Sequence, residues 1–365
     1  MKDQLQKHRE RTRLKILCGI AFIAVLGVTL WPFDPFPRNR VSWLPEANGI
    51  SFGNSGVVVS DAPLTTGSGL SGSYSVEILL RPATVESSQT ILTFYAEDNP
   101  RPFLVRQSRS DLFISHGFVE FAGLDHFFGQ GQLVFLAMIS GPSGTVVYRN
   151  GHQARAFATF RILPNDLSGK IVMGSSAMYV ESWQGEVHGL AIYSRELLPA
   201  EVLQDYNTWI GGHGIGDSHG ATASFAFTEH AGRYIHNSVV SGPNLEIPTF
   251  FEVPSHGFLT SPAKDFEANW GYVSHLFENI AGFVPLGFFL CAYLAMTRSQ
   301  RRAILYATVA SGILSLTIEV LQAYIPQKES DVTDIITNTL GAFAGALLAR
   351  PRIVRMLLEK TIFRG

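Results

Sequence analysis

The sequence predicts a multidomain membrane protein with four transmembrane α-helices and an extracytoplasmic all-β sandwich inserted between the first and second helices. Three observations lead to this fold class. The chain has 365 residues, of which 46% are hydrophobic and only 16% are charged, whereas a soluble protein carries about 25% charged residues. The apolar residues gather in runs at the two ends of the chain. Between these ends, short apolar runs alternate with glycine and asparagine, which is typical of strands joined by turns.

Composition also excludes several classes of protein. A net charge of -2 argues against a nucleic-acid-binding protein, which needs a basic surface. The two cysteines, Cys18 and Cys291, both lie in apolar runs and cannot form a disulfide framework. The 26 phenylalanines exclude a disordered chain, because disordered segments are poor in aromatic residues.

The first apolar run, residues 16–32, is expected to be an uncleaved signal anchor. It follows a basic tail, residues 1–15. A basic region before an apolar stretch is also the pattern of a cleavable signal peptide, but no small-x-small cleavage motif follows here. A lipoprotein anchor does not fit, because Cys18 precedes the apolar core instead of following it. The run therefore predicts transmembrane helix 1.

Three further apolar segments crowd into the C-terminal part of the chain, at residues 272–297, 303–325 and 332–350. Each is close to the ~20 residues that a helix needs to cross a bilayer. Helix is the expected form, because lipid cannot satisfy open backbone groups. The remaining residues, 351–365, form an amphipathic tail that we expect to lie on the inner membrane surface.

Basic residues predict the orientation of these helices. Arg298, Arg301 and Arg302 lie between the second and third spans, and more basic residues follow the fourth span. By the positive-inside rule, this loop and both termini face the cytoplasm. The protein is then a multi-pass membrane protein with both termini in the cytoplasm, and the sandwich, residues 40–250, is extracytoplasmic.

The long middle segment is interpreted as strands. Residues 74–80 alternate apolar and polar side chains, which predicts one buried face. Residues 133–139 form a continuous apolar run, which suits a strand covered on both faces. Residues 145–149 meet Asn150-Gly151, a strong hairpin signal. Further strands are predicted at residues 170–173 and 186–193, and a helix at residues 198–206, with Pro199 in its first turn.

The order of these pieces resembles a known domain family. The matching stretches are NGISFGNSGVVV, SYSVEILLRPA, TVVYRNGHQ, KIVMG and WQGEVHGLAIYSRELLPAEVLQDY. Together they resemble the laminin-G-like jelly roll of the concanavalin A-type lectin and glucanase superfamily, over residues 47–209. Residues 222–248 resemble the opening strands of another such domain and are expected to add strands to the same sandwich. The glycine-rich residues 211–220, which include His213 and His219, are interpreted as a flexible connector without metal.

The resemblance implies binding of a glycan or a protein, although fold alone does not establish function. Hydrolases of the superfamily place two or three carboxylates at alternating positions of one strand, because acid and base must flank one glycosidic bond. Glu77 and Glu186 each stand alone on their predicted strands and are expected to face solvent. Asp61, Asp98 and Asp125 show no calcium-binding spacing. We therefore expect neither metal nor cofactor.

The C-terminal segments resemble a second family. The stretches are NIAGFVPLGF from Asn279, EVLQ from Glu319, SDVTD from Ser330 and NTLGAFAG from Asn338. They resemble the VanZ-like family of bacterial membrane proteins over residues 272–350, with residues 16–32 as the family's first helix. Where that family usually has arginine, this chain has Lys328, which keeps the charge but loses the bidentate fork.

Polar residues within these helices are the main candidate site. Glu319 and Gln322 share one helix face because they are three apart, and Asp334 and Asn338 share a face because they are four apart. Ionisable residues in a membrane segment are costly and usually functional or paired. The candidate outer-leaflet polar cluster consists of Asn279, Glu319, Gln322, Lys328, Asp331, Asp334 and Asn338.

Three interpretations of this cluster remain open. The first is structural: Asp331 and Asp334 cap a helix, and Glu319 binds Asn338 or Lys328 to lock the helices together. The second is a site for a lipid headgroup or lipid-linked glycan, and the third is catalysis. Close helix packing explains the small residues Gly341 and Gly345, and Pro285 with Gly287 predicts a kink.

Together with these resemblances, the sequence predicts a non-enzymatic protein of the bacterial cell envelope, which crosses the cytoplasmic (inner) membrane several times. Its sandwich would bind an envelope glycan or an extracytoplasmic protein, and its helical bundle would sit in the lipid bilayer and contact lipid-linked glycans. The alternative is a membrane enzyme that acts on a lipid-linked substrate, with Glu319 or Asp334 as acid or base. A weaker alternative is a glycosidase in the sandwich, which needs a carboxylate pair about 5–10 Å apart.

Overall fold

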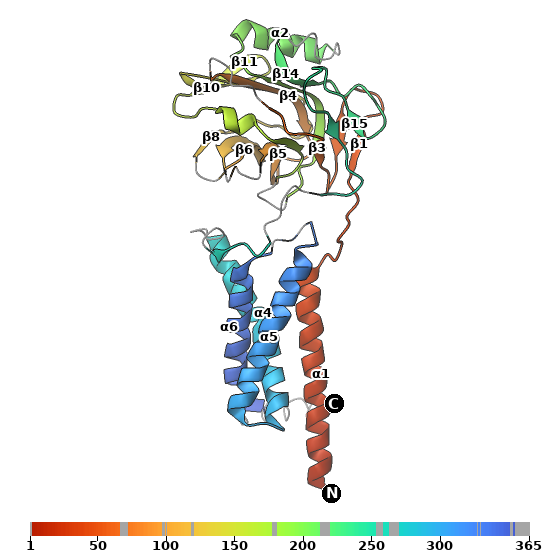
Figure 1. The fold of residues 1–365 in the computed structure, drawn as a ribbon, viewed down its shortest axis with the longest axis vertical. Helices are drawn as coiled ribbons and strands as arrows, with labels where there is room; N and C mark the ends of the chain where they lie inside the picture. Colours follow the sequence, from red (N-terminus) through yellow and green to blue (C-terminus); the bar gives the residue numbers. More distant parts are fainter. Residues whose placement is uncertain are drawn as a thin grey trace. The chain divides into compact units, whose positions relative to one another are not determined.

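A computed structural model of the chain forms two compact units (Figure 1). One unit comprises Met1–Pro35 with His256–Gly365, and the other comprises Phe36–Ser255. The structure describes residues 2–65, 72–96, 99, 101–117, 120–176, 181–211, 220–252, 258–262, 270–326, 328, 330–350 and 353–354. Asp98, His213, His219 and most of the predicted tail 351–365 lie outside these residues.

The unit Phe36–Ser255 is a sandwich of two eight-stranded antiparallel sheets, which confirms the predicted all-β domain. The first sheet has the order β1-β2-β13-β4-β9-β10-β11, with β14 paired to β13. Its strands are β1 (Val41–Trp43), β2 (Ile50–Phe52), β13 (Gly185–Tyr193), β4 (Tyr74–Pro82), β9 (Val134–Gly141), β10 (Gly144–Arg149), β11 (His152–Phe157) and β14 (Ala221–Phe225).

The second sheet has the order β15-β16-β3-β12-β5-β6-β7-β8. Its strands are β15 (Tyr234–Ile235), β16 (Leu245–Glu246), β3 (Val58–Ser60), β12 (Lys170–Met173), β5 (Ser88–Tyr95), β6 (Phe103–Ser108), β7 (Asp111–His116) and β8 (Glu120–Leu124). The late strands β14 and β16 pair with β13 and β3 respectively, so the segment after the glycine-rich connector adds to both sheets.

A large apolar core fills the space between the sheets. Val76 and Ile78 of β4 belong to it, together with Phe94 and Trp183. The opposite face of β4 is also buried, because helix α2 (Pro199–Ile210) packs there through Val202 and Trp209. The one-sided burial predicted for residues 74–80 is therefore wrong.

The same helix corrects the interpretation of Glu77. We expected this residue to face solvent, but its side chain is completely buried and accepts a hydrogen bond from the Tyr193 hydroxyl at 3.3 Å. Glu186 is half-buried and ion-paired with Arg81 at 2.9 Å. The predicted hairpin is confirmed: Asn150 and Gly151 join β10 to β11 with φ values of 53° and 77°, as a turn with two left-handed residues requires.

The other unit is a bundle of helices α1 (Lys2–Leu30), α4 (Trp270–Ala295), α5 (Gln300–Gln322) and α6 (Val332–Leu348). Three of them, over Gln4–Leu30, Trp270–Ala295 and Gln300–Gln322, are long and apolar enough to cross a membrane, and the apolar helix α6 is shorter, with 17 residues. The first helix begins at Lys2, so the basic residues expected as a separate tail extend the helix instead.

Glycines set the packing of α4 against α6. A Cβ atom at Gly287 would lie 2.0 Å from the carbonyl oxygen of Ala342, and one at Gly341 would lie 2.1 Å from that of Ile280. The backbones therefore touch directly, as small residues permit in membrane helices. Pro285 lies inside α4, which continues through it as one helix.

Candidate functional site

Glu319 lies on α5 and is 1% exposed. Its Oε2 atom accepts a hydrogen bond of 3.0 Å from the backbone N–H of Asp331, in the turn that follows α5. A buried carboxylate is stabilised when donors point at it. The first partner of Glu319 is thus a backbone amide, and no hydrogen bond or ion pair joins it to Asn338 or Lys328 among the described residues.

Asp331 extends this contact into α6. It is the N-cap residue of α6, and its Oδ1 atom accepts the backbone N–H of Asp334 at 2.8 Å. This is the geometry of an aspartate that satisfies an orphan donor of the first helical turn. Asp334 in turn accepts a hydrogen bond of 2.6 Å at Oδ1 from the side-chain amide of Asn279 on α4.

The result is a continuous polar chain of four residues across three helices, which we call the polar chain: Glu319, Asp331, Asp334 and Asn279. Exposure rises along it. Glu319 is 1% exposed, whereas the side chain of Asp334 is 15% exposed. The polar chain therefore leads from the bundle interior to an accessible end.

The remaining members of the predicted cluster lie elsewhere. Asn338 donates a hydrogen bond of 3.0 Å to the hydroxyl of Ser315, which ties α6 to α5 one turn below Glu319. Gln322 donates to the carbonyl oxygen of Thr29 at 3.1 Å and so ties α5 to α1. Lys328 forms no ion pair with a described residue. The predicted cluster thus divides into the polar chain and two separate hydrogen bonds between helices, and Lys328 belongs to neither.

The sequence interpretation missed His275. Its Nδ1 atom lies 3.8 Å from Asp334 Oδ1, and its side chain is 53% exposed. The signal was present, because His275 and Asn279 are four apart and share one face of α4. A carboxylate, an amide and an imidazole at one accessible point can bind hydroxyl or amine groups by hydrogen bonds. Among the described residues, no group of three His, Cys, Asp or Glu side chains could hold a metal ion.

The sandwich holds its own charged clusters. Arg106 makes two hydrogen bonds of 3.1 Å to Glu181, whose carboxylate also accepts the Thr90 hydroxyl. Burial raises the pKa of Glu181, and the Arg106 charge opposes this shift. A second carboxyl group, that of Asp205, lies beside Glu77. Since Glu77 is completely buried, this carboxyl pair is not arranged to flank a glycosidic bond in a bound substrate.

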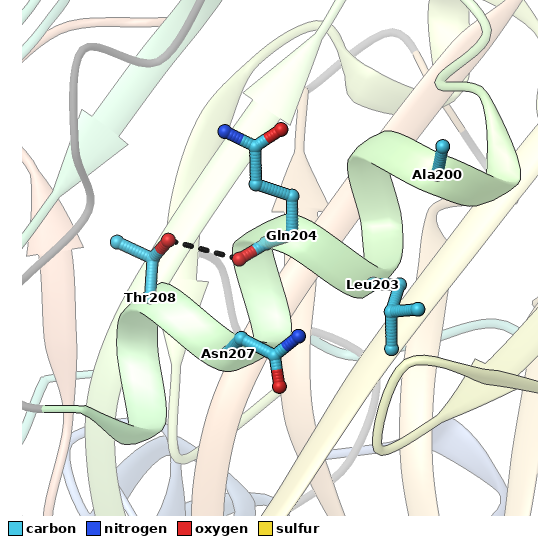
Figure 2. A pocket seen from close by; sticks show the side chains of 5 residues that line it. All are labelled: Ala200, Leu203, Gln204, Asn207 and Thr208. Atoms are coloured by element: carbon cyan, nitrogen blue, oxygen red, sulfur yellow. Dashed lines mark hydrogen bonds between the residues drawn. The ribbon is translucent and has the colours of Figure 1, made fainter.

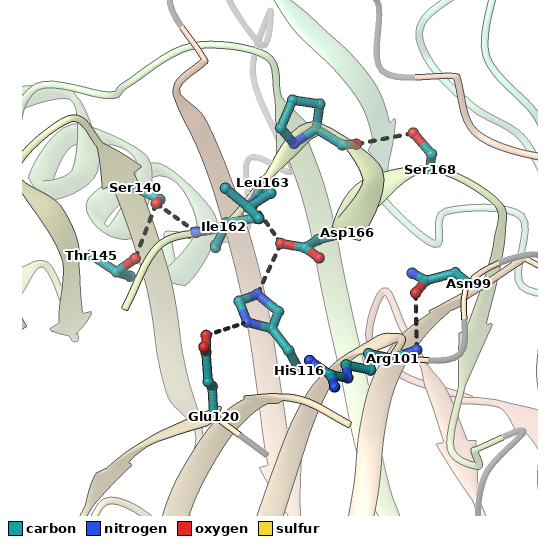
Figure 3. Close-up of polar contacts among 11 residues, drawn as sticks. Asn99, Arg101, His116, Glu120, Ser140, Thr145, Ile162, Leu163, Asp166 and Ser168 are labelled. Carbon is teal, nitrogen blue, oxygen red and sulfur yellow. Dashed lines mark hydrogen bonds and ion pairs between the residues drawn. The ribbon is translucent and has the colours of Figure 1, made fainter. Parts of the chain in front are cut away.

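His116 forms a third cluster, at the end of β7 (Figure 3). Its Nε2 atom lies 2.9 Å from Asp166 Oδ2, and its Nδ1 atom lies 3.4 Å from Glu120 Oε2. The hydrogen bond with Asp166 raises the pKa of His116, and burial opposes this shift. The ring also stacks on Phe160 at 4.8 Å. These contacts fasten the segment between β11 and β12 to β7, which is a structural role.

A hollow of about 490 Å³ lies along the outer face of α2 (Figure 2). Its lining residues are Ala200, Leu203, Gln204, Asn207 and Thr208. All of them belong to one helix and none is charged, so the hollow lacks the convergent polar groups of a ligand site.

Two family models match different parts of the chain. The family model "Concanavalin A-like lectin/glucanases superfamily" matches residues 52–203, and the family model "VanZ/LLP1" matches residues 221–356. The second match begins at β14, within the sandwich. No curated protein matches the chain in sequence.

Similar solved structures include a putative carbohydrate-binding protein from Bacteroides ovatus, with 12% identity, a TM-score of 0.40 and coverage of 59% of this chain and 60% of that chain. A SAP-like pentraxin from Limulus polyphemus has 14% identity, a TM-score of 0.37 and coverage of 58% and 93%. The binding domain of botulinum neurotoxin DC, in complex with rat synaptotagmin II, has 12% identity and a TM-score of 0.35, with coverage of 47% and 46%, so this chain spans less than half of it.

With TM-scores below 0.5, these structures add nothing to the fold assigned from the strands themselves. The two family matches carry the assignment, because they fall on the sandwich and on the helices that hold the polar chain. The chain thus carries a concanavalin A-like, laminin-G-type domain over residues 52–203 and a VanZ-like domain over residues 221–356.

Proposed function

We propose that this protein is a non-enzymatic membrane protein of the bacterial cell envelope, which binds a lipid-linked envelope glycan at the accessible end of the polar chain. The observation that carries the proposal is the hydrogen bond of 2.6 Å between Asn279 and Asp334. The side chain of Asp334 is partly exposed, and its backbone N–H is bound by the Asp331 carboxylate. A fixed carboxylate beside a fixed amide offers both acceptors and a donor, which suits the hydroxyl groups of a sugar.

In this proposal all four helices cross the inner membrane, with both termini in the cytoplasm and the sandwich outside. Helix α6 has 17 residues, at the lower limit for a span, and it packs closely along α4. Exposed aromatic side chains stand at one end of the other three helices: Trp31 after α1, Trp270 at the start of α4 and Tyr324 after α5. Trp and Tyr favour the membrane interface, so these side chains support an outer boundary at this level.

The sandwich is the second binding element of the proposal, for a glycan or an extracytoplasmic protein. Its support is the family match to lectins and glucanases. Recognition is favoured over hydrolysis because Glu77 is buried and Glu181 is neutralised by Arg106. Both carboxylates are therefore engaged in holding the fold.

The experiment uses the full-length protein in lipid nanodiscs and a polyprenyl-diphosphate-linked disaccharide as probe. We expect Asp334→Asn to weaken binding at least tenfold, since the loss of a charged hydrogen-bond acceptor costs about 1.5–3 kcal/mol. Glu278→Gln is the matched control, because Glu278 is an exposed carboxylate on α4, next to Asn279. Equal affinity of both variants and the parent protein would remove the proposal.

A membrane enzyme is the second candidate, and the observation that favours it is His275 beside Asp334 at 3.8 Å. An imidazole and a carboxylate can share acid–base work. This candidate predicts chemical turnover of the same probe by the parent protein and its loss in His275→Gln. Mass spectrometry detects any product of the probe. Binding of the probe without a product would support the non-enzymatic proposal.

A further inference from the structure

Residues 258–262, which we call the strap, lie against the turn between α5 and α6. The backbone N–H of Thr260 donates a hydrogen bond of 3.0 Å to the carbonyl oxygen of Ser330, and the N–H of Val332 donates one of 3.0 Å to the carbonyl oxygen of Thr260. Together they form a parallel β-bridge between Thr260 and Asp331. The strap is thus hydrogen-bonded to the residues on both sides of Asp331, Ser330 and Val332.

Asp331 is also the residue that holds Glu319. Its backbone N–H points at the Glu319 carboxylate, and its side chain caps α6. The strap therefore fixes the one residue through which the buried and accessible parts of the polar chain are joined. In the structure the bridge is formed, and Glu319 is 1% exposed.

Two facts make the strap a movable part. The bridge joins single residues of the two segments, Thr260 and Asp331, and it consists of two backbone hydrogen bonds. Phe258, at its start, is 60% exposed and so is not anchored in a core. Local openings occur preferentially where few buried contacts hold a segment.

We propose that the strap closes over Glu319 and that its release admits a ligand from the outer side to this carboxylate. The inference rests on the proposed function for the identity of that ligand, but the closure itself is a property of the chain. In the closed state, only the Asp334 end of the polar chain is accessible. In the open state, Glu319 becomes accessible as well.

Val332→Pro is the variant that releases the strap. It removes the N–H that binds Thr260, while proline is well tolerated at the first position of a helix. The preceding residue, Asp331, already has φ -138° and ψ 157°, a conformation that a following proline favours. Val332→Ala keeps the N–H and is the matched control. Thr260→Pro removes the other hydrogen bond of the bridge.

The probe is dicyclohexylcarbodiimide, which modifies carboxyl groups in apolar surroundings, and mass spectrometry follows the peptide that contains Glu319 in the full-length protein. We expect modification at least tenfold faster in Val332→Pro and in Thr260→Pro than in Val332→Ala or the parent chain. Equal rates of Glu319 modification in all four proteins would contradict the proposed closure by the strap.

Amide hydrogen exchange of the parent protein provides a test without substitutions. If the strap opens as a unit, the amides of Thr260 and Val332 exchange at similar rates, and at least tenfold faster than the amide of Ala342 inside α6. Exchange of all three at one rate would contradict the inference. If the strap inference is wrong, the probe still binds at Asp334. If the proposed function is wrong, the probe does not bind, and the modification and exchange rates are unaffected.

Discussion

The two units of the chain satisfy their buried polar groups in different ways. In the sandwich, two largely buried carboxylates meet basic side chains, Glu181 with Arg106 and Asp166 with His116, whereas the buried Glu77 meets the Tyr193 hydroxyl. In the helical unit, Glu319 meets a backbone amide and Asn338 meets a hydroxyl group. Among the described residues of that unit, no lysine or arginine is ion-paired with a carboxylate.

The two units also differ in how their elements pack together. The sandwich core is made of large side chains such as Trp183, Phe94 and Phe225, whereas α4 and α6 meet through glycines. In water, burial of large apolar groups drives folding. In lipid, that driving force between helices is absent, and close backbone contact with hydrogen bonds replaces it. The comparison therefore predicts different sensitive positions in the two units.

The largest effect is expected in the sandwich core. Trp183 is 1% exposed, packs edge-on against Phe52 at 5.8 Å, and donates a hydrogen bond of 2.8 Å to Gln107. Trp183→Ala should lower the free energy of unfolding of the sandwich by about 3–5 kcal/mol. Chemical denaturation followed by near-ultraviolet circular dichroism measures this loss. Trp31→Ala, at an exposed position, should change that free energy by less than about 0.5 kcal/mol.

The bundle should respond instead to added volume. A Cβ atom at Gly345 would lie 2.0 Å from the carbonyl oxygen of Val284, so Gly345→Ala should destabilise the bundle by about 1–3 kcal/mol. Gly282→Ala is the matched control, because nothing lies within 4 Å of its added Cβ. Unfolding of the detergent-solubilised protein by a denaturing surfactant distinguishes the two variants. Equal stability of both would mean that α4 and α6 do not touch as described.

The smallest effect concerns the acid buried beneath α2. Burial, and next the neighbouring Asp205, raise the pKa of Glu77 well above its usual value. The folded state therefore binds a proton that the unfolded state releases above pH ~4.3. The contribution of Glu77 to the stability of the sandwich should be greatest below that pH and should fall as the pH rises toward the raised pKa.

Glu77→Gln should remove this dependence and stabilise the sandwich by on the order of 1 kcal/mol at neutral pH. Thermal unfolding between pH 4 and pH 8 checks the slope. Glu86→Gln, on an exposed loop, serves as the control and should leave the slope unchanged. A steeper slope in Glu77→Gln than in the parent chain would contradict the assignment.

Local patterns predicted much of this structure. The Asn150-Gly151 turn and the apolar run that became β9 were readable because turn chemistry and continuous burial are properties of short segments. Glu77 was misjudged because the face it occupies is covered by α2, far along the chain. Alternation along one strand cannot show what covers its second face.

The polar chain was partly predictable for the same reason. Helical spacing placed Glu319 and Asp334 on the correct faces, but it could not show that a backbone amide, from Asp331, stands between them. Gln322 is not part of the polar chain, because its side chain binds a carbonyl oxygen at the end of α1. Backbone partners carry no side-chain signature, so only the folded chain identifies them.

In the proposed topology a membrane separates the sandwich from the α4–α5 loop, and cysteine labelling tests this topology directly. In a chain with Cys18→Ala and Cys291→Ala, single cysteines replace Val240, exposed in the sandwich, or Thr297, exposed after α4. A membrane-impermeant maleimide is then added to spheroplasts. We predict labelling at position 240 in intact spheroplasts, and at position 297 only after permeabilisation. Labelling of position 297 in intact spheroplasts, or protection of position 240, would contradict the account.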